Sequence, residues 1–180
     1  MNHDRYDDAY IAEIFGMVKS VAMVGASANS VRPSYFVMKY LLAKGFAVTP
    51  VNPGLGGQEI LGQRVVASLA DIGHPIDMID VFRNSEAAGE VTREAIGMKD
   101  ALGLKVIWMQ LSVRNDAAAA DAEAAGLRVV MNRCPKIEYG RLSGEIGWAG
   151  VSSGLISSKR PVLGAGVQNQ MIGGVGNKRT

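Results

Sequence analysis

The residues best suited to chemistry stand in a short polar stretch that follows the apolar run 20–24. Gly25 allows a sharp turn because it has no Cβ, and the small side chains of Ala26 and Ser27 leave their backbone amides open to an anion. The Ser27 hydroxyl adds a donor, and Arg32 adds a positive charge. Where such a turn leads into a helix, the free N–H groups of the first helical turn favour a phosphate. The pattern predicts a phosphate-binding turn at residues 25–27.

The end of the next apolar run indicates which nucleotide would fit this turn. The turn lacks the second and third glycines of the dinucleotide motif G-x-G-x-x-G, so it also fits a tight connection without a ligand. NAD sites place Asp or Glu near the end of the second strand to bind the ribose 2′-hydroxyl. Here that strand ends in Val51-Asn52-Pro53, without a carboxylate. This favours a ribose that carries a phosphate, as in coenzyme A or NADP.

Few other residues form a pattern typical of catalysis. His3 is expected in a mobile N-terminus and His74 in a loop, so two isolated histidines and the single cysteine have no metal-ligand spacing. Asp77 and Asp80, three apart on a predicted strand, would face opposite sides of the sheet. No serine lies in a G-x-S-x-G frame. We therefore expect neither catalytic residues nor a metal site.

Cys134 leaves two interpretations open. Its neighbours Arg133 and Lys136 could lower its pKa and allow exchange with the thiol of coenzyme A. A buried, small apolar side chain is the favoured alternative. Trp108, at the end of an apolar run, is likewise expected in the core rather than as a platform for a ligand.

Apolar runs alternate with helical patterns along the chain. The predicted strands occupy residues 20–24, 46–51, 65–66, 76–81, 104–108 and 127–131. The predicted helices occupy residues 7–18, 33–44, 85–99 and 116–125, with a helical turn at 69–71. Such alternation is typical of βαβ units. It predicts an α/β fold in one domain, a Rossmann-like, doubly wound and mostly parallel sheet with the site at the carboxyl ends of its strands.

Composition bounds the organisation and the partners. The chain has 180 residues, 48% of them hydrophobic, which suits one compact domain. We expect an N-terminal amphipathic helix in residues 1–19, the nucleotide-binding domain in 20–150, and a glycine-rich flexible tail in 151–180. The exposed edge of an open sheet and the apolar N-terminal helix are compatible with a homodimer or other homo-oligomer.

Charge and hydropathy exclude several partners. The net charge is +2, without a basic cluster, so neither nucleic acid nor an anionic membrane is expected as a partner. No apolar run approaches the roughly 20 residues that span a bilayer. One cysteine and a polar, acidic N-terminus unlike a signal peptide lead us to expect a cytoplasmic protein.

Several short motifs occur together in a characteristic order. They are Val24-Gly25-Ala26-Ser27, Arg32-Pro33-Ser34, Val51-Asn52-Pro53, Ile60-Leu61-Gly62, Asp80-Val81-Phe82-Arg83, Trp108-Met109-Gln110 and Asn132-Arg133-Cys134. With this set the chain resembles the small stand-alone CoA-binding proteins over residues 10–145. That family is similar to the N-terminal CoA-binding domain of the succinyl-CoA synthetase α subunit. The resemblance implies a Rossmann-like fold with coenzyme A bound across the strand ends.

The resemblance also implies roles for single residues. Carried over to this chain, it places Gly25, Ala26 and Ser27 on the pyrophosphate, and Asn52 and Pro53 along the nucleotide. The positions that would meet the adenine and the pantetheine arm are Phe82, Arg83, Gln110, Leu111 and Ser112.

The chain departs from the synthetase at one charged position. The synthetase has a lysine after the corresponding proline, and this chain has Gly54. Positive charge would therefore come from Arg32 or Arg83, or the affinity for coenzyme A would be weaker. Arg83 also fits a surface salt bridge to Glu86 or Glu90.

The function implied is non-catalytic binding of coenzyme A or an acyl-CoA. The synthetase also needs a phosphorylated histidine from a second domain, for which this chain has no room. Two alternatives stay open. One is an NADP-dependent oxidoreductase, although no Tyr-Lys or His-Asp donor arrangement is evident. The other is an accessory subunit that provides a CoA site to a separately encoded acyl-CoA ligase.

Overall fold

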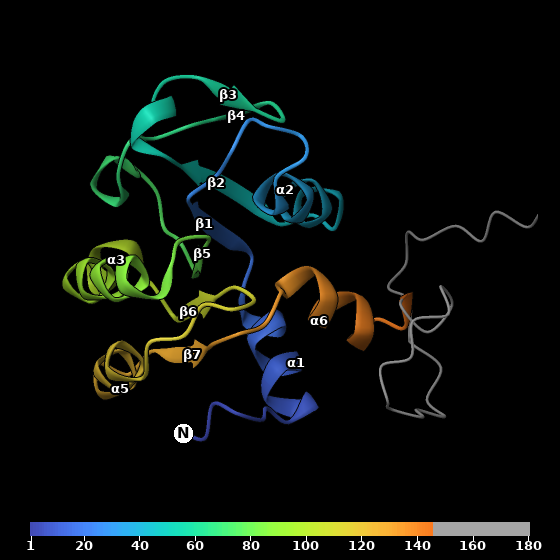
Figure 1. The fold of residues 1–180 in the computed structure, drawn as a ribbon, viewed down its shortest axis with the longest axis vertical. Coiled ribbons are helices and arrows are strands. Elements are labelled where there is room, and N and C mark those ends of the chain that lie inside the picture. The colour runs from blue at the N-terminus through green and yellow to red at the C-terminus, as the bar shows by residue number, and fades with distance from the viewer. Residues whose placement is uncertain (146–180) are drawn as a thin grey trace, which may run out of the picture.

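The computed structural model describes residues 1–145 and shows a single α/β domain with a parallel sheet between two layers of helices (Figure 1). The sheet order is β2-β1-β5-β6-β7. Its strands are β1 (Ser20–Val24), β2 (Ala47–Val51), β5 (Met78–Val81), β6 (Val106–Met109) and β7 (Arg128–Val130). The predicted Rossmann-like fold is confirmed. The predicted tail, 151–180, and the last residues of the predicted domain, 146–150, lie outside the described residues.

The helices divide between the two faces of the sheet (Figure 1). On one face lie α1 (Asp8–Met17), α2 (Pro33–Ala43) and α6 (Pro135–Leu142). On the other lie α3 (Ser85–Gly97) and α5 (Asp116–Ala124), with the short α4 (Lys99–Leu102) after α3. Each face has its own apolar core. Because both faces are covered, the central strands β5 and β6 are buried along their whole length.

A hairpin and a helix are the main differences from the elements that the sequence predicts. The expected short strand at Val65 and Val66 is replaced by an antiparallel hairpin of β3 (Glu59–Ile60) and β4 (Gln63–Arg64). Val66 forms only an isolated parallel bridge to Val51. Helix α6 is absent from the predicted elements, because its alternation of polar and apolar residues is weak. It begins at Pro135, a residue favoured in the first turn of a helix.

Other parts of the chain occupy both edges of the sheet. At β7, the Tyr10 hydroxyl donates to the Val129 carbonyl, and the Tyr6 hydroxyl accepts from the Met131 N–H at 2.7 Å. At β2, the Val66 N–H donates to the Pro50 carbonyl at 3.0 Å. These contacts cover part of each edge strand. Homo-oligomerisation stays a prediction.

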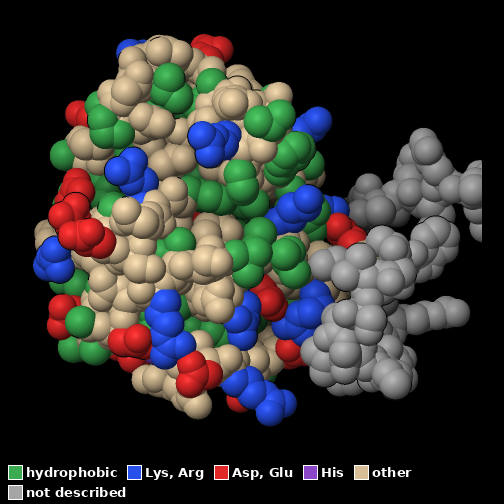
Figure 2. All heavy atoms as spheres, in the orientation of Figure 1, with side chains coloured by type: hydrophobic (Ala, Val, Ile, Leu, Met, Phe, Trp, Pro, Cys, Tyr) green, Lys and Arg blue, Asp and Glu red, His purple; other side chains and the backbone are tan. Residues whose placement is uncertain are grey.

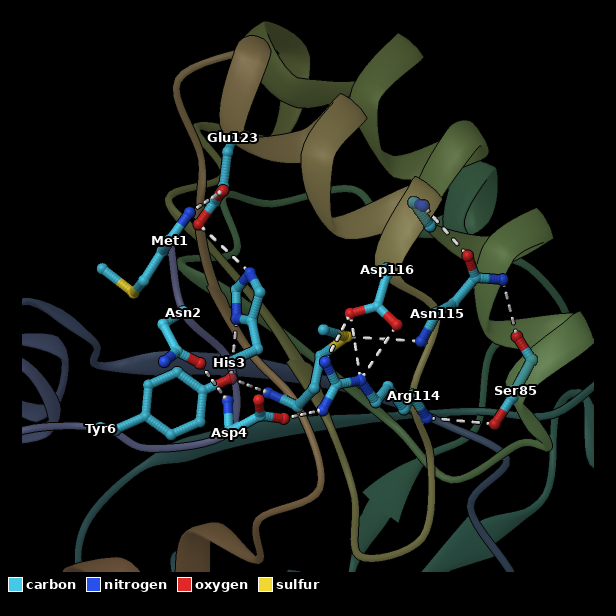
Figure 3. A network of polar contacts seen from close by, with 12 residues as sticks. Met1, Asn2, His3, Asp4, Tyr6, Ser85, Arg114, Asn115, Asp116 and Glu123 are labelled. Carbon is cyan, nitrogen blue, oxygen red and sulfur yellow. Dashed lines mark hydrogen bonds and ion pairs between the residues drawn. The ribbon is translucent and has the colours of Figure 1, made fainter.

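The N-terminal segment lies against α5 rather than moving freely (Figure 3). The α-amino group of Met1 contacts Glu123 at 2.9 Å. The His3 ring is buried, with Nδ1 2.8 Å from the Tyr6 hydroxyl and Nε2 3.4 Å from Glu123. The expectation of a mobile N-terminus is therefore wrong for His3. Desolvation lowers the pKa of this imidazole, as is typical of a structural histidine.

The face of the molecule drawn in Figure 2 carries charge without concentrating it. In the view of Figure 2, Lys and Arg side chains are spread among acidic and hydrophobic ones rather than gathered in one stripe. Among the described residues, no helix has the length and apolar character needed to cross a membrane.

Asp77 ties together the amino-terminal ends of β1 and β6. Its carboxylate accepts hydrogen bonds from Lys105 Nζ at 2.6 Å and from the backbone N–H groups of Lys19 and Ser20 at 2.8 and 3.0 Å. Burial raises the pKa of Asp77, but these hydrogen bonds outweigh that effect and hold the pKa at about 2. The ionised form therefore stabilises the fold.

We expect Asp77→Ala to lower the free energy of unfolding at pH 7 by about 2 kcal/mol. Because the folded pKa lies below the unfolded one, this contribution is complete above about pH 5 and disappears as the pH falls toward 2. Urea unfolding of both proteins between pH 2.5 and 7 measures it. Asp100→Ala is the matched control, because the Asp100 side chain is 97% exposed. Equal losses of unfolding free energy in the two variants would contradict a stabilising role for the ionised Asp77.

Candidate functional site

A pocket of about 330 Å³ opens at the carboxyl ends of β1 and β5, beside the start of α2. It brings together seven residues that the sequence analysis places at the site and two that it does not. Its lining consists of Gly25, Ala26, Ser27, Arg32, Pro33, Ser34, Asn52, Phe82 and Arg83. Two of these side chains are cationic and none is acidic, so this pocket suits an anion.

Gly25 has a backbone conformation and a position that exclude a side chain. Its φ is +88°, in the left-handed region, and a Cβ there would lie 2.7 Å from the carbonyl oxygen of Phe82. The Gly25 N–H donates to the Val51 carbonyl at 3.0 Å. The turn after β1 is thereby held close to the ends of both neighbouring strands, β2 and β5.

Asn52 positions this turn from β2. Its side-chain Nδ2 donates to the Ala26 carbonyl at 2.7 Å, and its Oδ1 accepts from the Gly54 N–H at 2.9 Å. In a trans peptide the C=O and the following N–H point in opposite directions. The Ser27 N–H is therefore turned away from Asn52. The structure gives Asn52 a bracing role, while its contact with the nucleotide stays a prediction.

The loop before α2 folds through its own side chains. Asn29 N–H donates to the Ser27 hydroxyl at 3.2 Å, and Val31 N–H donates to Asn29 Oδ1 at 3.1 Å. Arg32 takes the N-cap position of α2 without a capping hydrogen bond from its side chain. Pro33 has no N–H, and the Tyr35 N–H donates to the Arg32 carbonyl at 3.1 Å. The Ser34 N–H is therefore the donor that the first turn keeps for another partner, and the helix dipole adds positive potential there.

Ser34 is a site residue that sequence reasoning missed. It is the second residue of α2, it lines the pocket, and it is only 4% exposed. Within residues 1–145 its hydroxyl has no hydrogen-bond partner, yet no side-chain oxygen or nitrogen is both fully buried and unpaired. The hydroxyl therefore reaches the pocket. The sequence feature that could have indicated this role is the motif Arg32-Pro33-Ser34, in which a serine follows a proline in the first turn of a helix.

A second hollow of about 200 Å³ adjoins the first, because Gly25 and Arg83 line both. It lies between the strand ends and α3, and it contains the predicted residue Pro53. Its remaining walls are Val24, Val51, Ala67, Ser68, Leu69, Ala87, Glu90, Val91 and Glu94. The two hollows together offer a cationic compartment beside a mainly apolar one.

Arg83 lies where the two hollows meet. The described residues provide it with no ion pair, so the predicted alternative of a salt bridge to Glu86 or Glu90 is not found. Its guanidinium is available to a ligand.

The three predicted residues at the end of β6 line neither hollow. Gln110 is 6% exposed, and its Nε2 donates to both carboxyl oxygens of Asp80, at 2.8 and 3.1 Å. Leu111 is 53% exposed. The Ser112 N–H donates to Asn132 Oδ1 at 2.8 Å. Since β5 lies between β1 and β6, these residues flank the crevice one strand away, and their contact with a ligand stays a prediction.

Neither Cys134 nor Trp108 has the character of a reactive or stacking group. Cys134 is 7% exposed, and burial raises the pKa of its thiol, which favours the apolar interpretation. Trp108 is fully buried and donates its indole N–H to the Arg133 carbonyl at 2.8 Å. In residues 1–145 no cluster of His, Cys, Asp and Glu is placed to hold a metal ion. Another hollow, of about 630 Å³, lies beside the outer edge of β2 and contains no predicted site residue.

The parallel, doubly wound sheet with an anion-suited pocket at its first crossover defines a nucleotide-binding type of domain. Residues 19–140 match the family model described as CoA binding domain, and the chain belongs to that family. It is 36% identical over 131 residues to the uncharacterized protein YneT of Bacillus subtilis, a match that covers 73% of this chain and 93% of that protein.

Solved structures agree with this assignment. The fold is similar to that of a protein from Pyrococcus horikoshii OT3, with 38% identity, a TM-score of 0.71, and coverage of 79% of this chain and 96% of the other. It is also similar to part of the dinucleotide-forming acetyl-coenzyme A synthetase 1 of Ca. Korarchaeum cryptofilum. In that case the identity is 20% and the TM-score 0.53, over 63% of this chain and 26% of the synthetase. At that identity the likeness concerns the fold alone.

Proposed function

We propose that the protein binds coenzyme A, or an acyl-CoA, at the carboxyl ends of β1, β2 and β5, and that it does so without catalysing a reaction. The observation that carries the proposal is the pocket at the start of α2. It combines the N–H and the buried hydroxyl of Ser34 with Arg32 and Arg83, two arginines that have no ion pair within residues 1–145. Its lining has no acidic side chain. These are the groups that bind a diphosphate.

The neighbouring hollow supports the same ligand. Its walls at Val51, Pro53 and Val91 are apolar, which suits the flat face of an adenine, and Arg83 between the compartments can reach a phosphate. Family membership adds independent support. The proposal of a non-catalytic role rests on the lining of the phosphate pocket, whose only ionisable groups are Arg32 and Arg83, whereas Glu90 and Glu94 belong to the neighbouring hollow. Neither arginine exchanges a proton near neutral pH.

Calorimetric titration with four ligands tests the proposal. We expect coenzyme A to bind most tightly, 3′-dephospho-CoA more weakly by about tenfold because one charge-assisted contact is removed, and NADP and NAD weaker still. Binding of NAD without binding of coenzyme A would refute the assignment. A higher affinity for NADP than for coenzyme A, together with oxidation of NADPH by a carbonyl substrate, would instead support an oxidoreductase.

A further inference from the structure

Asp80 is a carboxyl group in the centre of the sheet. It belongs to β5, is 0% exposed, and lies in register with Met23 of β1 and Trp108 of β6, neither of which carries a charge. Acidic side chains are almost never fully buried without a charged partner. The parallel sheet itself requires no acid at this position, so the presence of Asp80 has another physical cause.

The surroundings of Asp80 contain little that would stabilise a negative charge. Gln110 Nε2 donates to both of its oxygens, and these are its only hydrogen bonds within the described chain. Cys134, the N-cap residue of α6, interacts electrostatically with Asp80, and Lys136 interacts electrostatically with Cys134. No described lysine or arginine pairs with Asp80 itself. Burial raises the pKa of Asp80 to about 8, and the hydrogen bond from Gln110 offsets this only in part.

Asp80 is also close along the chain to the phosphate pocket. Phe82, the first residue after β5 and two residues beyond Asp80, lines that pocket together with Gly25. The Phe82 N–H donates to the Val24 carbonyl at 2.8 Å and so continues the pairing of β5 with β1. Residues two apart on a strand face the same side, and each residue advances the chain by about 3.3 Å. The Cα of Asp80 is therefore about 7 Å along the chain from that of Phe82, a residue that lines the pocket in which an anionic ligand would rest.

We propose that binding of a phosphate-bearing ligand at residues 25–34 is coupled to the uptake of a proton by Asp80. The inference rests on the proposed function and concerns the regulation of the same site. A ligand with several negative charges repels an ionised Asp80 and displaces water above it, and both effects favour the neutral acid. A unit charge roughly 10 Å away, at an effective dielectric constant of about 20, raises the pKa of a carboxyl group by about one unit. Arg32 and Arg83 reduce this repulsion without abolishing it.

The experiment measures the dissociation constant of acetyl-CoA, whose blocked thiol does not titrate, between pH 6.5 and 9.5. For the wild-type protein we expect nearly constant affinity below pH 7 and a loss on the order of tenfold by pH 9.5, because the ligand then competes with ionisation of Asp80. Asp80→Asn should keep the affinity measured at pH 6.5 and lose the decline. The introduced amide keeps the shape of the neutral acid, and the Gln110 amide can rotate to pair with it. Asp100→Asn, on the surface, should behave as the wild type.

A second measurement does not depend on a variant. Titrations at pH 8 in buffers of different ionisation enthalpy report the protons taken up by the wild-type complex, and we expect about half a proton per ligand. A wild-type affinity independent of pH, no proton uptake, or an unchanged decline in a folded Asp80→Asn variant would each overturn the inference while leaving the proposed function intact. Absence of binding at pH 6.5 would overturn the proposed function and the inference with it.

Discussion

Gly25→Ala is expected to abolish binding of coenzyme A and to lower the free energy of unfolding by roughly 3 kcal/mol. Two independent effects contribute. A residue with a side chain is strained at a φ of +88°, and its Cβ would lie 2.7 Å from the Phe82 carbonyl oxygen. Relief of that contact must separate the turn from the end of β5. The backbone N–H groups of Ala26 and Ser27 then lose the positions that a diphosphate requires.

Gly45→Ala is the matched control. Gly45, after α2, has nearly the same φ, +87°, but open space where its Cβ would be. We expect it to cost about 1 kcal/mol for backbone strain alone and to leave binding unchanged. Urea unfolding and calorimetry on both variants provide the comparison. If Gly25→Ala retained affinity for coenzyme A, the phosphate-binding turn would be disproved.

The cost in stability of a side chain at Gly25 could not be predicted from the sequence. The close approach of the Phe82 carbonyl joins two segments more than fifty residues apart in the chain, and the sequence contains no sign of it. A substitution at Gly25 thus reports on binding only when stability is measured alongside.

Arg83→Gln is expected to weaken binding of coenzyme A by about 10- to 100-fold, the usual loss when a hydrogen bond to a charged partner is removed. Arg83 lines both hollows and has no ion pair among the described residues, so it can contact a phosphate without first breaking a protein contact. Since Gly54 stands where the synthetase has a lysine, little other charge is available to compensate. The free energy of unfolding should stay within about 0.5 kcal/mol of that of the wild type.

The control for Arg83 is Arg93→Gln, an exposed arginine on α3 that lines neither hollow. It changes the net charge equally, so any effect on affinity from long-range charge alone would appear in both variants. Calorimetric titration at two salt concentrations separates the contact of Arg83 with a phosphate from the long-range effect of net charge. Added salt weakens the long-range attraction more than it weakens a direct contact. Equal losses in the two variants would remove Arg83 from the site.

The sequence could predict the sheet because burial on both faces leaves a direct pattern. Continuous apolar runs such as 20–24 and 104–108 became β1 and much of β6, since parallel strands with helices on either side need apolar residues at every position. The hairpin of β3 and β4 escaped prediction because each strand has only two residues. Helix α6 escaped because a single turn or two of mixed polarity shows no clear period.

The candidate site was predictable where local chemistry marks it and not where tertiary contacts do. Gly25, Ala26 and Ser27 follow a strand, and a turn of small residues in that place is typical of a phosphate site. The pocket role of Ser34 depends on Asn52 and Phe82, which follow two other strands and line the same pocket. The orientation of Gln110 depends on Asp80, thirty residues earlier, and a buried polar pair of this kind leaves no local sequence signal.

The hydrogen bonds of Tyr6 and Tyr10 at β7 show that the folded domain includes residues before the family match. The family match starts at residue 19, but Tyr6 and Tyr10 satisfy backbone groups of the last strand from outside that region. Helix α1 also contributes the fully buried Ile14 to the core. The cooperative folding unit of this protein is therefore longer than the stretch that the family model matches. A fragment limited to that stretch would present an unpaired strand to its neighbours and an uncovered apolar face to water.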